Sequence, residues 1–72
     1  MAKHKYWSGT VDRYDSFGRV IEDTFYDAAT THGPWAIMTP LSFQQYGMDK
    51  VGLGLGQKYE KQSDGRWLKT EG

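Results

Sequence analysis

Side chains that do acid–base or nucleophilic chemistry occur along this chain without the grouping that catalysis requires. Glu22 and Asp23 are adjacent carboxylates, but in an extended segment they point to opposite faces and cannot flank one substrate bond. None of the four serines has the sequence context of an activated nucleophile: Ser8, Ser16, Ser42 and Ser63. We therefore expect a protein that is not an enzyme and has no catalytic residue.

Three glycines alternate with leucines in the run from Gly52 to Gly56. A dinucleotide-binding loop needs a strand before it and a helix after it, and a P-loop needs Gly-Lys-Ser/Thr. Here we expect a helix before the run and a strand after it. The run therefore predicts a flexible connector and no bound cofactor.

Metal-ligating side chains are sparse. The chain has no cysteine, which excludes disulfides and thiolate metal sites. Its two histidines, His4 and His32, have no second ligand at metal-binding spacing. We expect no metal site.

Basic and aromatic side chains alternate near the C-terminus, at Lys61, Arg66, Trp67 and Lys69. In such a pattern an aromatic ring can stack on single-stranded bases while the cations contact phosphates. The alternative, which we favour, is that Trp67 stabilises a hairpin while the lysines keep it soluble. These four residues are the candidate partner-binding set.

Composition favours a protein partner over nucleic acid. Nine basic and nine acidic residues give a formal net charge of zero. A protein that holds duplex DNA through its phosphates usually has a basic excess. No apolar run approaches the roughly 18 residues of a membrane span, and no signal-peptide pattern follows Met1. We expect a cytoplasmic protein with no membrane partner.

The length of 72 residues suits a single domain, 1–72, with one modest core. A domain of this size buries only about 60% of the surface of its unfolded chain. Three Trp, five Tyr and three Phe supply the largest apolar groups, so the core must be mainly aromatic.

The residue pattern predicts strands over 5–11, 19–27 and 35–38, with the third antiparallel to the second. Residues 14–18 form a turn and 28–34 a loop. Ile21 and Phe25 share one face of the second strand. A two-turn helix follows over 40–46, with Thr39 as N-cap and Pro40 at the first helical position; Gly47 then takes a left-handed conformation.

Asp64-Gly65 predicts a C-terminal hairpin with a two-residue loop. This register places Glu60 opposite Lys69 and Lys58 opposite Glu71. It also points Tyr59 and Leu68 to the core and puts Trp67 on the other face.

The order of a glycine-containing turn, a hairpin and a short helix resembles a treble-clef zinc finger or zinc ribbon. In that scaffold a Cys-x-x-Cys-Gly knuckle and a Cys-x-x-Cys pair at a helix start bind one zinc ion. The corresponding positions here hold Tyr14, Phe17, Thr39 and Ser42, with Gly18 after the knuckle. The segment 33–38 and the later Gly-Leu-Gly-Leu-Gly-Gln-Lys-Tyr run are also similar to small phage-encoded zinc-finger proteins of unassigned function.

The resemblance implies a small, metal-free, treble-clef-like α+β domain with a finger-like core at about 14–47 and a hairpin at about 57–71. Tyr14 and Phe17 would fill the place of the zinc, so Phe17→Ala would cost about 3–5 kcal/mol. No activity is attached to the resemblance. We expect a non-enzymatic binding module, a degenerate zinc-finger scaffold of unknown target, in the host cytoplasm if it is phage-encoded. The alternative is a weak nucleic-acid-binding protein.

Overall fold

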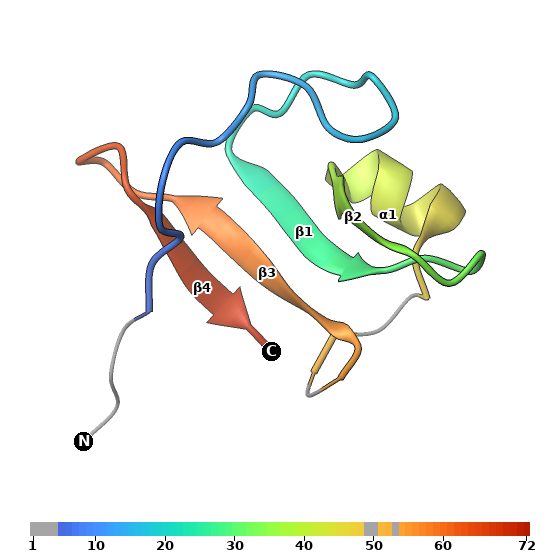
Figure 1. Cartoon of the computed structure of the whole chain (residues 1–72). Coiled ribbons are helices and arrows are strands. Elements are labelled where there is room, and N and C mark those ends of the chain that lie inside the picture. The colour runs from blue at the N-terminus through green and yellow to red at the C-terminus, as the bar shows by residue number, and fades with distance from the viewer. Residues whose placement is uncertain (1–4, 49–50, 53) are drawn as a thin grey trace.

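The computed structural model of the protein describes residues 5–48, 51, 52 and 54–72. It confirms an α+β fold, in which a four-stranded antiparallel sheet of order β2-β1-β3-β4 carries one short helix (Figure 1). The elements are β1 (Thr24–Ala29), β2 (Trp35–Met38), α1 (Pro40–Tyr46), β3 (Gly56–Lys61) and β4 (Trp67–Glu71). The treble-clef resemblance is not confirmed. β1 of the finger-like segment pairs directly with β3 of the C-terminal hairpin, so the two share one sheet.

Helix α1 has the predicted bounds, and Thr39 is its N-cap: the Thr39 hydroxyl accepts a hydrogen bond from the Ser42 backbone N–H at 3.3 Å. The expectation for Gly47 is wrong, because this residue is extended, with φ −79° and ψ 175°. Glycine is needed there for space, since a Cβ at Gly47 would lie 2.5 Å from the Phe43 ring. A seven-residue helix is not stable alone. Packing of Phe43 on Tyr26, with the rings 4.0 Å apart and nearly parallel, holds it on the sheet.

The second predicted strand is shifted toward the C-terminus. β1 begins at Thr24 and continues to Ala29, whereas the prediction covered 19–27. Before β1 the chain forms a tight turn, closed by a bridge between Tyr14 and Val20. Ile21 packs against Phe25 on one face as predicted, and β2 pairs antiparallel with β1 over the predicted residues.

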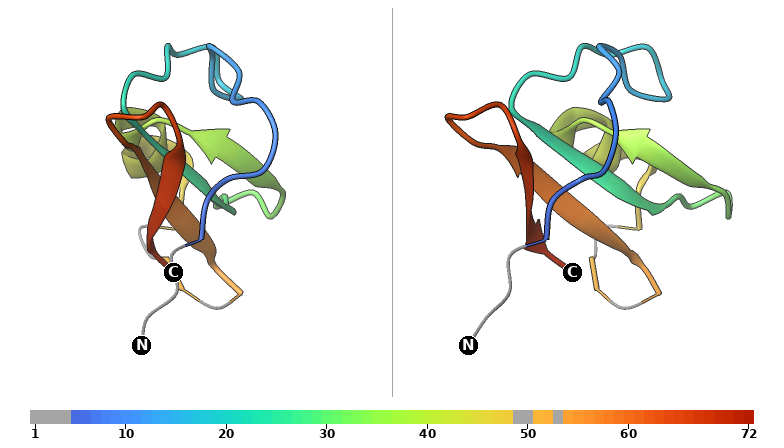
Figure 2. Two further views of the ribbon diagram at one scale, coloured as in Figure 1. Left: turned by 90° about the vertical axis from the view of Figure 1, so that its left-hand side faces the viewer. Right: turned by 60° about the vertical axis from the view of Figure 1, so that its left-hand side comes forward.

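The predicted strand over 5–11 is wrong; these residues begin a segment that we call the N-terminal strap (residues 5–16). The strap pairs with the outer edge of β4 only around Tyr6, where the Trp7 N–H donates to the Trp67 carbonyl at 2.9 Å. It then crosses one face of the sheet and reaches the outer edge of β2. There the Ser16 N–H donates to the Ile37 carbonyl at 2.8 Å and the Ile37 N–H donates to the Ser16 hydroxyl at 3.0 Å. Figure 2 shows the strap and α1 on opposite faces of the sheet.

Each face of the sheet has its own apolar cluster. On the helix face, Ala28, Met38 and Phe43 are buried together. On the strap face, Trp7 sets its ring edge-on against Phe25 and Tyr59, with centroids 5.2 and 5.3 Å away. The strap-face cluster is thus mainly aromatic, as the composition predicts.

The register predicted for the C-terminal hairpin is wrong by one residue. Gln62 pairs with Arg66 through a 2.7 Å backbone bond, so the loop has three residues, and Glu60 lies opposite Leu68. The Asp64 carboxylate accepts from the Arg66 N–H at 2.9 Å, and Gly65 takes a positive φ of 88°, as in a three-residue loop that ends on a left-handed glycine.

The longer loop exchanges the faces of two apolar side chains. Trp67 lies on the strap face, where it contacts Phe25. Leu68 pairs with Glu60 and therefore points to the other face of the sheet, away from Tyr59. A register shift at Lys58/Tyr59 then restores the predicted pairing of Lys58 with Glu71.

Gly56 is the glycine on which the sheet most depends. Its φ is +142°, and an added Cβ would lie 2.3 Å from the Ala28 Cβ. We expect Gly56→Ala to destabilise the fold by roughly 2–5 kcal/mol, because overpacking of about 1–3 kcal/mol adds to backbone strain of about 1–2 kcal/mol. Gly54→Ala, at positive φ but in open space, is the control and should cost only the backbone strain of about 1–2 kcal/mol. Urea unfolding measures both, and equal losses would contradict the close approach of β1 and β3.

Candidate functional site

The four positions that correspond to zinc ligands divide into two exposed aromatic residues and two buried polar ones. Tyr14 and Phe17 are 54% and 41% exposed, so the expectation that they fill a buried site is wrong. Phe17 instead stacks on Tyr46 at the surface, with ring centroids 4.2 Å apart. The loss of 3–5 kcal/mol expected for Phe17→Ala, which applies to a buried ring, is therefore too large. The two polar positions, Thr39 and Ser42, are both buried.

The side chain that enters between these segments is Asp15, which is 6% exposed. One carboxylate oxygen accepts hydrogen bonds from the N–H groups of Phe17 and Arg19, both at 2.9 Å. The other accepts from the N–H and the hydroxyl of Thr39, at 2.9 and 3.0 Å. Asp15 therefore joins the turn to the start of α1 with four hydrogen bonds.

This environment stabilises the charged form of Asp15. Burial by itself would raise the pKa of the carboxyl group. The nearby Ser42 hydroxyl and the backbone N–H groups of Thr39, Arg19 and Phe17 outweigh burial and lower the pKa from 3.8 to about 2. A strongly shifted carboxyl group often marks a functional site. Here the four hydrogen bonds join the turn to the start of α1, so we assign Asp15 a structural role.

Arg19 adds two further hydrogen bonds between the turn and α1. Its guanidinium donates to the Ser42 hydroxyl at 3.0 Å and to the Gln45 side-chain oxygen at 2.7 Å. Among the described residues, no buried side-chain N or O atom lacks a hydrogen-bond partner. The same part of the chain contains no group of three or more His, Asp or Glu side chains that could hold a metal ion. His32 is exposed, and His4 lies outside the described residues.

Three of the four candidate partner-binding residues make contacts with other side chains of the protein. Trp67 is half-buried against Phe25 at 5.1 Å, and the Lys61 ammonium lies 5.9 Å from the centre of the Trp67 ring. The Arg66 guanidinium stacks over Tyr6 at 4.1 Å and pairs with Asp64 at 2.8 Å. Lys69 is half-buried and lines a separate hollow with Lys5. The structure therefore keeps Lys61 beside Trp67 but directs Arg66 and Lys69 elsewhere.

The glycine-rich run forms a tight turn. Gly52 and Gly56 bridge each other, each N–H donating to the carbonyl of the other at 2.8 and 3.0 Å. The run leads into β3, as predicted. Leu53 lies outside the described residues.

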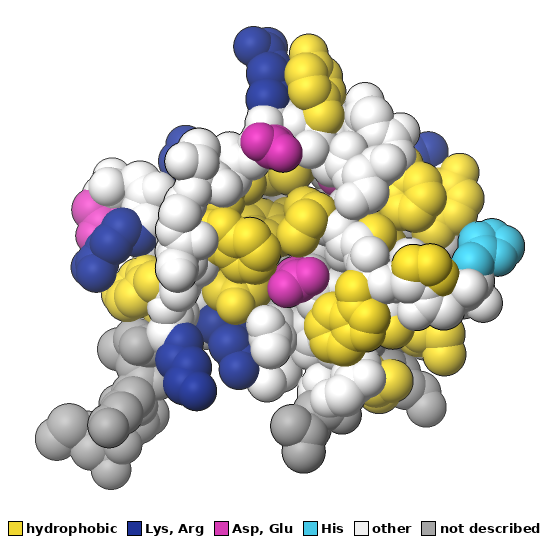
Figure 3. Space-filling model, in the orientation of Figure 1, with side chains coloured by type: hydrophobic (Ala, Val, Ile, Leu, Met, Phe, Trp, Pro, Cys, Tyr) yellow, Lys and Arg dark blue, Asp and Glu magenta, His cyan; other side chains and the backbone are white. Residues whose placement is uncertain are grey.

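A pocket that the sequence did not predict lies under the strap. It has a volume of about 120 Å³ and is bounded by the strap on one side and by β1 and β2 on the other. Figure 3 shows apolar side chains around a hollow in this face, with acidic side chains close by. The lining residues are Trp7, Thr10, Val11, Asp12, Tyr14, Ser16, Phe25 and Ile37.

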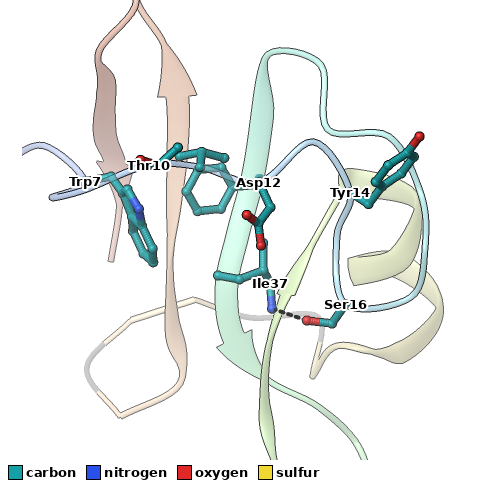
Figure 4. A pocket seen from close by; sticks show the side chains of 8 residues that line it. Trp7, Thr10, Asp12, Tyr14, Ser16 and Ile37 are labelled. Carbon is teal, nitrogen blue, oxygen red and sulfur yellow. Dashed lines mark hydrogen bonds between the residues drawn. The ribbon is translucent and has the colours of Figure 1, made fainter.

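Figure 4 shows how these side chains are arranged. Trp7 stands at one end of the pocket, and the Asp12 carboxylate points from the strap toward Ile37. Tyr14 points away from the pocket centre, and Ser16 holds the backbone of Ile37. The pocket therefore has apolar side chains on its sheet side and the polar side chains of Thr10, Asp12 and Ser16 on its strap side.

A second carboxylate, Asp27, lies next to the pocket on the same face. It follows Phe25 by two residues on β1 and pairs with Ile37 in register. Burial raises the pKa of Asp27 above its ordinary value of 3.8. Burial and then the charge of Asp27 also raise the pKa of Tyr59, which agrees with the two groups sharing a face.

Neither Asp12 nor Asp27 has a counter-ion in the described part of the chain. The ion pairs found there involve other carboxylates: Glu60, Asp64 and Glu71. One sequence signal for this site was present. Aspartate is depleted in strands, and its position two residues after Phe25 puts it on the buried face of β1.

No known protein family, curated protein or solved structure matches this chain. Within the described residues, no helix is long and apolar enough to cross a membrane.

Asp15 should make the stability of the protein depend on acid. Because its pKa is lowered on folding, its contribution is present above pH 3.8 and is lost as the pH falls toward 2. That loss should amount to roughly 2 kcal/mol. We expect Asp15→Asn to lower the free energy of unfolding at pH 7 by about 1.5–3 kcal/mol. The variant should also lose less of this free energy than the wild type when the pH falls from 3.8 to 2.

Urea midpoints measured from pH 7 to pH 2 test the Asp15 prediction. Asp12→Asn serves as the control, because Asp12 is exposed and makes no hydrogen bond within the described residues. The control should stay within about 0.5 kcal/mol of the wild type. If the urea midpoint of Asp15→Asn fell at acid pH as much as that of the wild type, the role given to Asp15 would be contradicted.

Asp27 should have the opposite effect. Because burial raises its pKa, the folded state loses stability as the pH rises from 3.8 through the raised value. We expect Asp27→Asn to raise the melting temperature at pH 7, with the difference vanishing near pH 3. Glu22→Gln, which removes an exposed carboxylate, should change it little. A lower melting temperature for Asp27→Asn at pH 7 would show that the charge stabilises the fold.

Proposed function

We propose that this protein is a non-enzymatic binding module that holds a protein partner on the strap face of its sheet. The observation that supports this most strongly is the pocket between the strap and strands β1 and β2, with Trp35 beside it. Trp35 shares a face with Ile37 on β2 and is 50% exposed. A half-open pocket next to an exposed tryptophan has the composition of a protein-interaction site, because aromatic residues are enriched at such sites.

The size of the pocket favours a side chain over a free small molecule. Sites for drug-sized ligands and cofactors have volumes of roughly 300–1,000 Å³, whereas this pocket has about 120 Å³. That space suits the end of one side chain from a larger partner.

The charge of this face argues against the alternative of nucleic-acid binding. Asp12 lines the pocket and Asp27 adjoins it, so a phosphate backbone would meet two negative charges there. The ring proposed to stack on bases, Trp67, is half-buried in the core. The Arg66 guanidinium already has a carboxylate and an aromatic ring as partners.

An affinity experiment with matched variants tests the proposal. Immobilised wild-type protein should retain a partner protein that Trp35→Ala retains at least tenfold more weakly. Leu41→Ala is the control, because Leu41 is 52% exposed but lies on α1, away from the strap. It should retain the partner like the wild type.

A nucleic-acid column distinguishes the alternative function. Retention by phosphate contacts weakens steeply as salt rises. We expect no salt-sensitive retention of the wild type. Such retention would favour nucleic-acid binding, and equal partner binding by Trp35→Ala and the wild type would contradict the proposed function.

A further inference from the structure

We infer that the pocket under the strap receives a basic side chain, lysine or arginine, presented by the protein partner. The inference rests on the proposed function and adds the chemistry of the group that is bound. The shape of the pocket, the two carboxylates beside it and the position of the chain's own cations support this inference.

The walls of the pocket suit the apolar stem of a long basic side chain. Trp7 stands at one end, and Phe25 and Ile37 line the sheet side (Figure 4). Lysine and arginine carry three or four methylene groups, which bury against apolar surface while the charged group stays at a polar rim. An acidic side chain would bring its charge next to Asp12, and no Lys or Arg of the described chain lines the pocket to meet it.

The charged end of such a side chain would meet Asp12. This carboxylate lies on the pocket wall, is exposed, and has no ion pair or hydrogen bond within the described residues. Asp27 lies across from Ile37 on the same face and likewise has no ion pair in that part of the chain. A cation bound here would satisfy one carboxylate and lie in the field of the second.

The position of Asp27 supports a binding role rather than a structural one. It lies within β1, a central strand of the sheet, where a partly buried and unpaired carboxylate opposes folding. An incoming cation would supply the missing counter-charge. A charged interaction that is partly withdrawn from water is also stronger than one at an open surface.

The basic side chains of this protein near the site are held elsewhere. Arg13 follows Asp12 directly, but its guanidinium lies over the Tyr14 ring at 5.9 Å, and Tyr14 points away from the pocket. Lys5 and Lys69 lie at the β4 end of the sheet, where they line another hollow together with Glu71. No Lys or Arg of the described chain lines the pocket itself.

Peptide titrations followed by ¹H–¹⁵N NMR test this inference. Four short peptides of one neutral sequence carry a central lysine, arginine, norleucine or glutamate. Norleucine keeps the apolar stem of lysine and removes its charge. We expect the lysine or the arginine peptide to shift the Trp7 indole and Ile37 amide signals, and to bind at least tenfold more tightly than the norleucine peptide. The comparison of lysine with arginine identifies the preferred cation.

Charge variants of the protein assign the effect to its carboxylates. Asp12→Asn and Asp27→Asn should each weaken binding of the better basic peptide by at least threefold and leave binding of the norleucine peptide unchanged. Glu22→Gln also removes one negative charge but lies outside the pocket lining, so it should bind like the wild type. Binding of the basic peptide should also weaken as salt rises.

Two results would overturn the inference in distinguishable ways. Equal binding of the norleucine and lysine peptides, with shifts at Trp7 and Ile37, would exclude recognition of a cation and leave the strap face as the binding surface. Absence of shifts at these two residues with all four peptides would overturn the inference. If the partner retained by the wild type were also retained equally by Trp35→Ala, the proposed function would fail as well.

Discussion

The fold depends on one buried carboxylate, that of Asp15. Its four hydrogen bonds fix the turn at Phe17 and Arg19 and fasten that turn to Thr39 at the start of α1. Helix α1 is only seven residues long, so its place on the sheet relies on contacts of this kind. These hydrogen bonds also bring Ser16 against Ile37, which is where the strap ends. In a domain without disulfides, these hydrogen bonds between distant segments supplement an apolar core of limited size.

The strap covers part of each edge of the sheet and part of one of its faces. A sheet of four strands has two open edges, and exposed edges pair with other chains. The strap pairs with β4 near Tyr6 and occupies the backbone of β2 at Ile37, so it protects part of each edge. Between these two points it crosses the strap face and places Trp7 on Phe25 and Tyr59. It covers only part of that face, and the pocket is the gap left between Trp7, Asp12 and the sheet.

Features governed by neighbouring residues were predictable from the sequence. The bounds of α1 follow from Thr39 and Pro40, and the β1–β2 pairing follows from two apolar segments joined by a short loop. The register of the last hairpin was not predictable from Asp-Gly alone, because the Asp64 side chain stabilises a three-residue loop. The burial of the Asp15 side chain was not predicted, because its hydrogen-bond partner Thr39 lies 24 residues away in the sequence. The strap and its pocket were missed for the same reason, although Asp27 on the face of Phe25 was a local signal.

Asp15 and Asp27 show that carboxylates within one small fold can have opposite consequences. Hydrogen-bond donors surround Asp15 and lower its pKa to about 2, so ionisation of this group strengthens the fold. Burial without such donors raises the pKa of Asp27, so ionisation of this group weakens the fold. A domain with a small core has little stability to lose. A carboxylate that opposes folding in a central strand is therefore the feature on which the proposed binding role rests. The pocket beside it is lined by two aromatic side chains, Trp7 and Phe25, and by a second carboxylate, Asp12.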